Sequence, residues 1–182
     1  NQHFTQVTKI WKMTLNDLLQ KRKYTELLNT FKENNISPDS VLDYKGRSIF
    51  QLLSIEEDVN GVIEALNLAY IHDCESNPKF RTVSSNSLHL SKDAIRRITK
   101  GARYYKIIFH DRRPLVYHLL KHKLFDLLRD LLTKKPKLRN TRIGAHEESL
   151  LHYAAVECDL DFIEYLIFDV QINPFIENTK GV

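Results

Sequence analysis

The histidine that most invites a chemical interpretation is His152, in the stretch SLLHYAAVECDLDFIEYLI at residues 149–167. A histidine changes its charge near neutral pH, so it can act as a general acid, a general base or a metal ligand. Two small residues, Ala154 and Ala155, follow it, and large apolar residues recur around them at helical spacing. His152 is therefore either an active-site residue presented on a helix or a part of helix packing.

Two further histidines, His118 and His122, are spaced i, i+4 and so lie on one face of a helix, as zinc-binding histidines do. The residues between them lack the glutamate of a His-Glu-x-x-His site, and the sequence offers no third ligand. Glycine-rich phosphate loops, Gly-x-Ser-x-Gly elbows and Cys-x-x-Cys pairs are absent from the sequence. We therefore predict a non-enzymatic chain that uses no cofactor, no metal and no small-molecule substrate.

The strongest electrostatic feature of the sequence is a basic block. Residues 92–142 carry 16 Lys/Arg against 4 Asp/Glu, a net charge of +12, whereas residues 143–182 carry a net charge of −7. Tyr104, Tyr105 and Phe109 interleave with the bases, a mixture that can neutralise phosphates and stack bases. The residues of this basic patch are Arg96, Arg97, Lys100, Arg103, Lys106, Arg112 and Arg113. An acidic protein, a nucleic acid and an anionic lipid surface are compatible partners, and a merely solvated helix face is the simpler explanation.

The composition is that of an ordinary globular protein. The chain has 182 residues, 42% hydrophobic and 27% charged, and no apolar run reaches the ~20 residues of a membrane span. No secretory signal is visible, and Cys74 and Cys158 stand far apart, as in proteins of reducing compartments. We expect a soluble intracellular protein of the cytoplasm, with the nucleus or a host-cell cytosol as alternatives. Because the chain begins without Met, we treat it as a fragment of a longer chain.

The elements that would position these residues recur along the chain. Apolar residues at 3-and-4 spacing predict pairs of short helices joined by tight turns, for example at 150–155 and 160–167. Units of this kind begin at Thr14, Ser48, Pro114 and Ser149. Their separations are 34, 66 and 35 residues, and 66 is two periods of 33. Since one helix pair cannot bury its apolar stripe alone, stacked pairs must share a core, and we predict an all-α helical solenoid.

The motif Ser-Leu-Leu-His-Tyr-Ala-Ala at 149–155 resembles the Thr-Pro-Leu-His-x-Ala-Ala of the ankyrin-repeat family, whose unit has about 33 residues. The resemblance implies that His152 hydrogen-bonds backbone at the start of a first helix, and that the alanines let paired helices approach closely. It also implies hairpins at 43–48 and 173–181 between units. The glycine between the two helices of a family unit is replaced by Cys158, Lys23 and Lys123, which leaves the geometry of these turns open.

We predict a single ankyrin-like repeat domain over residues 1–182, with HEAT-like or other α-solenoids as the competing fold. The units span about residues 14–38, 48–72, 113–144 and 145–182, with a divergent unit at 73–112. An irregular insertion at about 73–110 interrupts the period. We expect a polar loop at 77–87, a helix from Ser91 to near Gly101, and a strand or a helix at 103–109. The insertion is either a degenerate unit or a loop that presents residues to a partner.

The resemblance implies a protein-interaction scaffold or adaptor, whose partner binds a concave face formed by first helices and hairpin tips. A few aromatic and arginine side chains in a rigid groove would dominate such binding. Carried onto this chain, the candidate partner-binding residues are Tyr44, Arg47, Leu52, Glu56, His118, Lys121, Arg139, Arg142, Tyr153, Val156 and Glu157. The alternatives are nucleic-acid or anionic-phospholipid binding through residues 92–142, and a targeting role in a larger enzyme or a secreted effector.

Overall fold

The chain divides into two compact units. The computed structural model describes residues 15–38, 40, 42–43, 45–73, 81–83, 91–109, 111–157 and 159–182. The first unit comprises residues 1–79, 83–89 and 102–104, and the second comprises residues 80–82, 90–101 and 105–182. The described residues of both units are mostly helical, with two strands of three residues each. The predicted all-α class is confirmed at this level.

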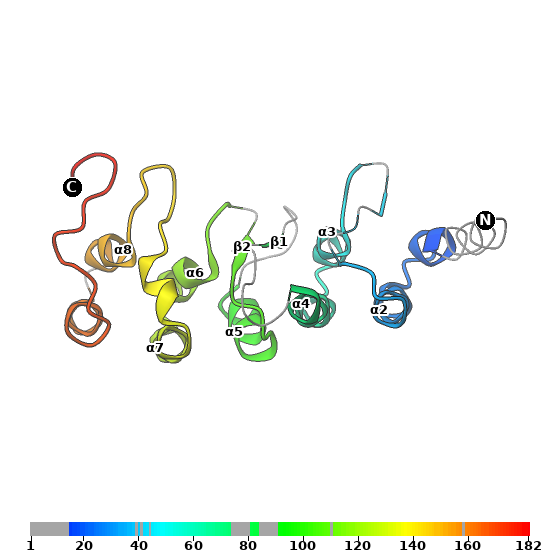
Figure 1. Cartoon of the computed structure of the whole chain (residues 1–182), viewed down its shortest axis with the longest axis horizontal. Helices are drawn as coiled ribbons and strands as arrows, with labels where there is room; N and C mark the ends of the chain where they lie inside the picture. The colour runs from blue at the N-terminus through cyan, green and yellow to red at the C-terminus, as the bar shows by residue number, and fades with distance from the viewer. Residues whose placement is uncertain are drawn as a thin grey trace. The chain divides into compact units, whose positions relative to one another are not determined.

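Helices around one apolar core form the first unit. Residues 15–20 are helical and are followed by α2 (Tyr24–Glu33), α3 (Ile49–Ile55) and α4 (Val59–Asp73). The helix at 15–20 and α3 lie in one row, and α2 and α4 lie in the other (Figure 1). α4 contacts both α2 and α3. The core between the rows includes the fully buried side chains of Leu27, Phe31, Phe50, Leu53 and Leu66.

The second unit also has two rows of helices. α6 (Leu115–Lys121) and α8 (Leu150–Val156) lie in one row, and α5 (Lys92–Gly101), α7 (Phe125–Lys134) and α9 (Leu160–Glu164) lie in the other (Figure 1). The smaller elements are β2 (Ile107–Phe109), which pairs with β1 (Arg81–Val83), the 3₁₀ turn η1 (Pro136–Asn140) after α7, and the π-helical turn η2 (Tyr165–Asp169) after α9. α6 contacts α5, α7 and α8 and is therefore the centre of the unit.

One tight turn recurs between the two helices of a pair. Arg22, Glu57 and Lys123 each have a positive φ, of 53°, 56° and 53°. The backbone N–H of the residue after each of them donates to the carbonyl of a buried leucine five residues earlier, over 2.9, 3.0 and 2.8 Å. These leucines are Leu18, Leu53 and Leu119. The three turns are 35 and 66 residues apart, which agrees with the period of the sequence.

The recurring turn settles two of the three positions at which the family glycine is replaced. Lys123 has the left-handed conformation that glycine adopts most easily. In the first turn, however, Arg22 has this conformation, and Lys23 does not, with a φ of −86°. In this turn the positive φ therefore lies one residue before Lys23, the position that the resemblance aligned with glycine. Cys158 lies outside the described residues.

Two of the predicted hairpins share one geometry. Asp43 Oδ1 accepts from the backbone N–H groups two and four residues later, both at 3.0 Å. Asn178 Oδ1 accepts from the same two positions at 2.9 and 3.2 Å. Gly46 and Gly181 occupy the equivalent place in the two loops, with φ of 72° and 73°. Since other residues are strained at such φ values, both loops depend on glycine.

The segment that interrupts the period is described in part. Helix α5 begins after Ser91, whose Oγ accepts from the Ala94 backbone N–H at 3.1 Å, and it ends at Gly101, as predicted. Residues 107–109 form β2, so the strand interpretation of this stretch is confirmed there. The loop expected at 77–87 contains β1 at 81–83, because pairing with β2, a partner distant in sequence, outweighs the local polarity. Residues 77–80 and 84–87 lie outside the described residues.

Candidate partner-binding site

An open groove in the first unit brings three of the predicted partner-binding residues together. It has a volume of about 290 Å³ and lies among the helix at 15–20, α2, α3 and the hairpin before α3. Arg47, Leu52 and Glu56 were predicted for one face, and all three line this groove; Tyr44 lies outside the described residues. The complete lining is Leu19, Gln20, Arg22, Tyr24, Asp43, Arg47, Leu52, Ile55 and Glu56.

Two ion pairs form the polar rim of the groove. Arg22 Nη1 lies 3.0 Å from Glu56 Oε1, and Arg47 Nε lies 2.6 Å from Asp43 Oδ2. Partial desolvation acts to raise the pKa of Asp43, but the backbone N–H and the guanidinium of Arg47 outweigh it and hold that pKa below its usual value. Each charge on the rim therefore has a partner of opposite sign.

The less polar part of the groove is formed by Tyr24 and by side chains of α3. Burial, together with the nearby Glu56, raises the pKa of Tyr24, so its hydroxyl stays protonated at neutral pH. Leu52 is buried, whereas Ile55 at the end of α3 is 37% exposed. The groove thus presents an apolar strip between paired charges, the pattern of a protein-binding surface with a polar rim.

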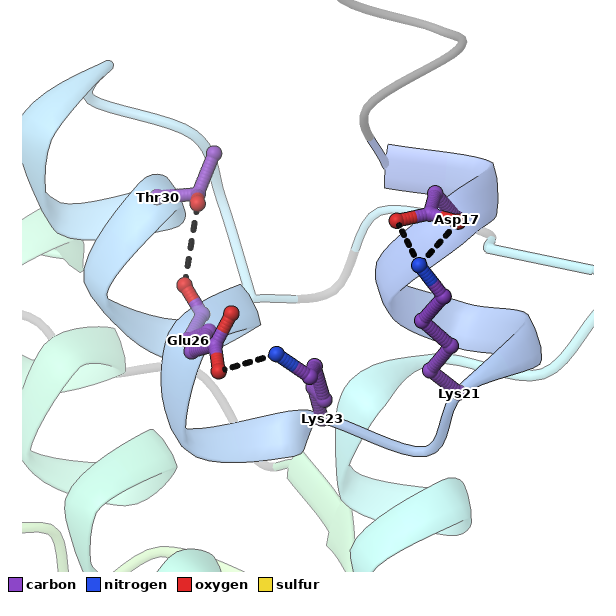
Figure 2. Close-up of polar contacts among 5 residues, drawn as sticks. All are labelled: Asp17, Lys21, Lys23, Glu26 and Thr30. Atoms are coloured by element: carbon purple, nitrogen blue, oxygen red, sulfur yellow. Dashed lines mark hydrogen bonds and ion pairs between the residues drawn. The ribbon is translucent and has the colours of Figure 1, made fainter.

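Figure 2 shows that the helices beside the groove neutralise other charges locally. Lys21 Nζ lies 2.9 Å from Asp17 Oδ1, and Lys23 Nζ lies 2.8 Å from Glu26 Oε1. The Thr30 hydroxyl donates to the Glu26 carbonyl at 2.9 Å. These pairs join residues within one turn of each other, whereas Arg22 reaches across to α3 and the groove.

His118 is buried in the second unit, with 2% of its surface exposed. Its Nε2 lies 3.2 Å from the Asp111 carboxylate, and its Nδ1 has no hydrogen-bond partner. The rings of Phe109 and Tyr117 meet it edge-on, with centroids at 4.8 and 5.2 Å. Burial lowers the pKa of His118, and Asp111 offsets only part of this effect, so the ring is neutral. The predicted partner-binding residue His118 is thus enclosed within its own unit.

Tyr153 links α8 to the hairpin that precedes α6. Arg113 Nη1 donates to the Tyr153 hydroxyl, which in turn donates to Glu148 Oε2 at 2.9 Å. The Arg113 guanidinium lies 4.6 Å from the centroid of the Tyr117 ring, and the Tyr117 and Tyr153 rings meet edge-to-face at 4.9 Å. Burial raises the pKa of Tyr153, and the bond to Glu148 adds to this effect. The predicted partner-binding residue Tyr153 is thus half-buried and engaged within its own unit.

The two predicted hairpin arginines of this unit also hold loops together. Arg139 Nη1 donates to the Val170 carbonyl at 3.2 Å. Arg142 Nη1 donates to the carbonyls of Glu147 and Glu177 at 3.0 and 3.2 Å. The other predicted residues of the unit, Lys121, Val156 and Glu157, are exposed at the ends of α6 and α8. Partner binding by these three residues stays a prediction.

His152 makes the backbone hydrogen bonds that the resemblance implies. Its Nδ1 accepts from the Ser149 backbone N–H at 3.1 Å, and its Nε2 lies 2.8 Å from the Val182 carbonyl. The first bond requires an unprotonated Nδ1, so Nε2 carries the proton and donates to Val182. His152 therefore caps the start of α8 and fastens the C-terminal hairpin to it.

The fold divides the predicted basic patch. Arg103 belongs to the first unit and the other six residues to the second. Tyr104 and Phe109 are buried, and the half-buried Tyr105 has Lys135 Nζ 4.8 Å from its ring centroid. The aromatic residues that were expected to stack on bases therefore face the protein interior or a lysine. Sequence spacing did not reveal this, because it does not show which side of a strand or loop is covered.

The predicted face also includes side chains that the sequence did not single out. Arg22 and Tyr24 lie at the turn between the helix at 15–20 and α2, where the family resemblance is weakest. Asp43 was predicted as part of the hairpin but not as the partner of Arg47. The i, i+4 spacing of these opposite charges was the available signal.

The class that the structure defines is a mostly helical protein of paired helices. The His118 and His122 rings are stacked 6.3 Å apart, and across the described ranges no group of three His, Cys, Asp or Glu side chains is arranged to hold a metal ion. None of the helices in those ranges has both the length and the apolar character needed to cross a bilayer.

Among protein-family models, curated proteins and solved structures, none matches this chain.

Proposed function

We propose that this chain is a non-catalytic protein-interaction scaffold, built as an array of ankyrin-like helix pairs. The turn that recurs at Arg22, Glu57 and Lys123 supports the array, as do the common hairpin geometry and the cap at His152. A surface of packed helix pairs within one unit is preorganised, which lowers the entropic cost of binding. The wide separation of the two cysteines supports a reducing, intracellular compartment such as the cytoplasm.

The groove of the first unit carries the proposal. Arg47, Leu52 and Glu56 were assigned to one binding face from the sequence, and they line one groove. The partner that fits is a peptide segment with an apolar side chain for the strip at Ile55. Charged groups on both sides of that side chain would exchange with the Arg22–Glu56 and Asp43–Arg47 ion pairs. Specificity would then come from the order of charges around one apolar anchor.

Replacing Ile55 by Glu tests this assignment. Ile55 is already partly exposed, so the new carboxylate is solvated in the free protein and is desolvated only when a partner covers the strip. The intact chain is used to select peptides from a displayed random library, and each selected peptide is titrated against wild type and variant. We expect the Ile55→Glu variant to bind at least about tenfold more weakly.

Ile71→Glu in α4 is the matched control. Ile71 is 66% exposed and lines a different groove of the same unit, with Leu28 and Leu68. This variant should keep the wild-type affinity. Equal affinities of wild type and Ile55→Glu, equal losses in both variants, or no peptide enriched above a selection without the chain would contradict the proposal.

A further inference from the structure

A row of unpaired cations runs along α5. Lys92, Arg96 and Lys100, here called the basic row, are spaced i, i+4, i+8 and are exposed. In the described part of the chain no carboxylate forms an ion pair with any of them, whereas Lys21 and Lys134 pair with acids four residues earlier on their own helices. Like charges four residues apart destabilise a helix. An anionic partner that neutralises the basic row would therefore stabilise α5.

The opposite end of the second unit has the complementary feature. Asp161 and Glu164 of α9, here called the acidic row, are exposed, and no ion pair to a cation is formed by either within the described ranges. Two large apolar side chains flank this row, Leu160 at 72% and Phe168 at 74% exposure. The π-helical turn at Tyr165–Asp169 follows α9 and carries Phe168. This face thus combines negative charge with uncovered apolar area.

The surroundings of the basic row favour a protein helix over other anions. Among the exposed side chains of α5 none is apolar, so α5 offers nothing to insert into a bilayer. Tyr104, the aromatic residue nearest to it in sequence, is buried, and the next, Tyr105, is half-buried with Lys135 Nζ 4.8 Å from its ring centroid, so neither is an open platform for stacking bases. An acidic helix with carboxylates at spacings of three to four residues matches the row directly, and α9 of this same chain is such a helix.

We propose that the second unit associates with a second copy of itself, the basic row of each copy against the acidic row of the other. α5 and α9 lie in one row of the unit, with α7 between them (Figure 1). A two-fold related copy therefore brings both complementary pairs together at once, as an isologous interface requires. Leu160 and Phe168 are covered in the same contact, which supplies the apolar area that exposed ion pairs alone lack.

Charge reversal in the intact chain tests the proposal. Arg96→Glu converts two repulsive i, i+4 pairs on α5 into attractive ones, and Glu164→Lys places a cation three residues after Asp161, so both variants should fold. By sedimentation velocity, the wild type should dimerise at about 50 mM salt and dissociate at about 500 mM. Each variant alone should dimerise at least about tenfold more weakly. An equimolar mixture should dimerise again, because one contact then has exchanged charges and the other has the native ones.

Lys180→Glu is the matched control, since it makes the same charge change in the C-terminal hairpin, away from the row of α5, α7 and α9 (Figure 1). It should dimerise as wild type does. A chain that is monomeric at low salt, a mixture that stays monomeric, or a loss of assembly in Arg96→Glu but not in Glu164→Lys would overturn the proposal. Heparin binding that needs Arg96 in a monomeric chain would assign the basic row to a polyanion instead. The proposal is independent of the groove, which lies in the first unit.

Discussion

At the scale of single residues, His118 of the second unit is a buried histidine with one ring nitrogen that has no hydrogen-bond partner. Its ring is enclosed by Phe109 and Tyr117, and its Nε2 faces the carboxylate of Asp111. A proton on Nδ1 would be buried without an acceptor, because that atom has no hydrogen-bond partner. Lys121 and His122, on the same helix, also disfavour a positive ring. The folded unit therefore holds His118 neutral.

This arrangement makes the second unit sensitive to acid. Because the pKa of His118 is lower in the folded state, His118 costs no stability above the ordinary histidine pKa of about 6.5. As the pH falls below that value, the unfolded chain takes up a proton that the folded unit does not, so stability decreases. Thermal unfolding between pH 8 and pH 5, followed by circular dichroism, measures this. His118→Gln keeps a donor for Asp111 but does not titrate, and it should show a weaker pH dependence; identical pH dependence of the two chains would contradict the argument.

At the scale of elements, side-chain bridges fix the order in which the pieces of the second unit pack. Arg113 and Tyr153 connect the hairpin before α6 to α8, and Arg142 connects the loop before α8 to the C-terminal hairpin. Helix α7 meets α9 through the stacked rings of Phe125 and Phe162, whose centroids are 4.7 Å apart. Neighbouring helix pairs are thus joined by hydrogen bonds at their hairpins and by aromatic stacking between their helices.

Removing one hydroxyl should show how much the first of these bridges contributes. Tyr153→Phe keeps the ring against Tyr117 but leaves both Arg113 and Glu148 without their partner. We expect a loss of about 1–2 kcal/mol in the free energy of unfolding, measured by urea denaturation. Tyr165→Phe, at a half-buried tyrosine of η2, should change stability by less than about 0.5 kcal/mol. Equal effects of the two substitutions would show that the bridge is not a stabilising contact.

Much of the element order could be predicted from the sequence, and the failures have local causes. The start and end of α5 followed from Ser91, the apolar Ala94, Ile95 and Ile98, and Gly101. The placement of Arg22 could not be predicted, because a non-glycine residue with positive φ has no mark in the sequence. The bonds of Arg139 to Val170 and of Arg142 to Glu177 were not anticipated, since these acceptors are backbone carbonyls distant in sequence.

At the scale of the whole molecule, each compact unit has a core of its own. Leu53 of α3 is fully buried in the first unit and Leu128 of α7 in the second. The predicted single array did not mark this division, because the helix period is the same in both units. The family resemblance implied one face for Arg47, Leu52 and Glu56, but it could not show how α2 contributes to the groove that they line.

Shortening a buried side chain in either core should lower the stability mainly of the unit that contains it. Leu53→Ala and Leu128→Ala each leave a cavity that costs about 2–5 kcal/mol. Hydrogen exchange measured by mass spectrometry should show faster exchange of α2–α4 amides for the first variant and of α6–α9 amides for the second. Equally faster exchange throughout the chain after either substitution would mean that the two units unfold in one cooperative step.

The turn shared by Arg22, Glu57 and Lys123 bears on how such a chain can change its length during evolution. Each copy of the turn is closed by a backbone hydrogen bond to a leucine carbonyl of its own helix pair. Duplicating or excising a whole pair would leave every surviving turn intact, whereas adding one residue inside a turn would break it. Lineages carrying this design are thus expected to gain or lose residues in steps of about one period.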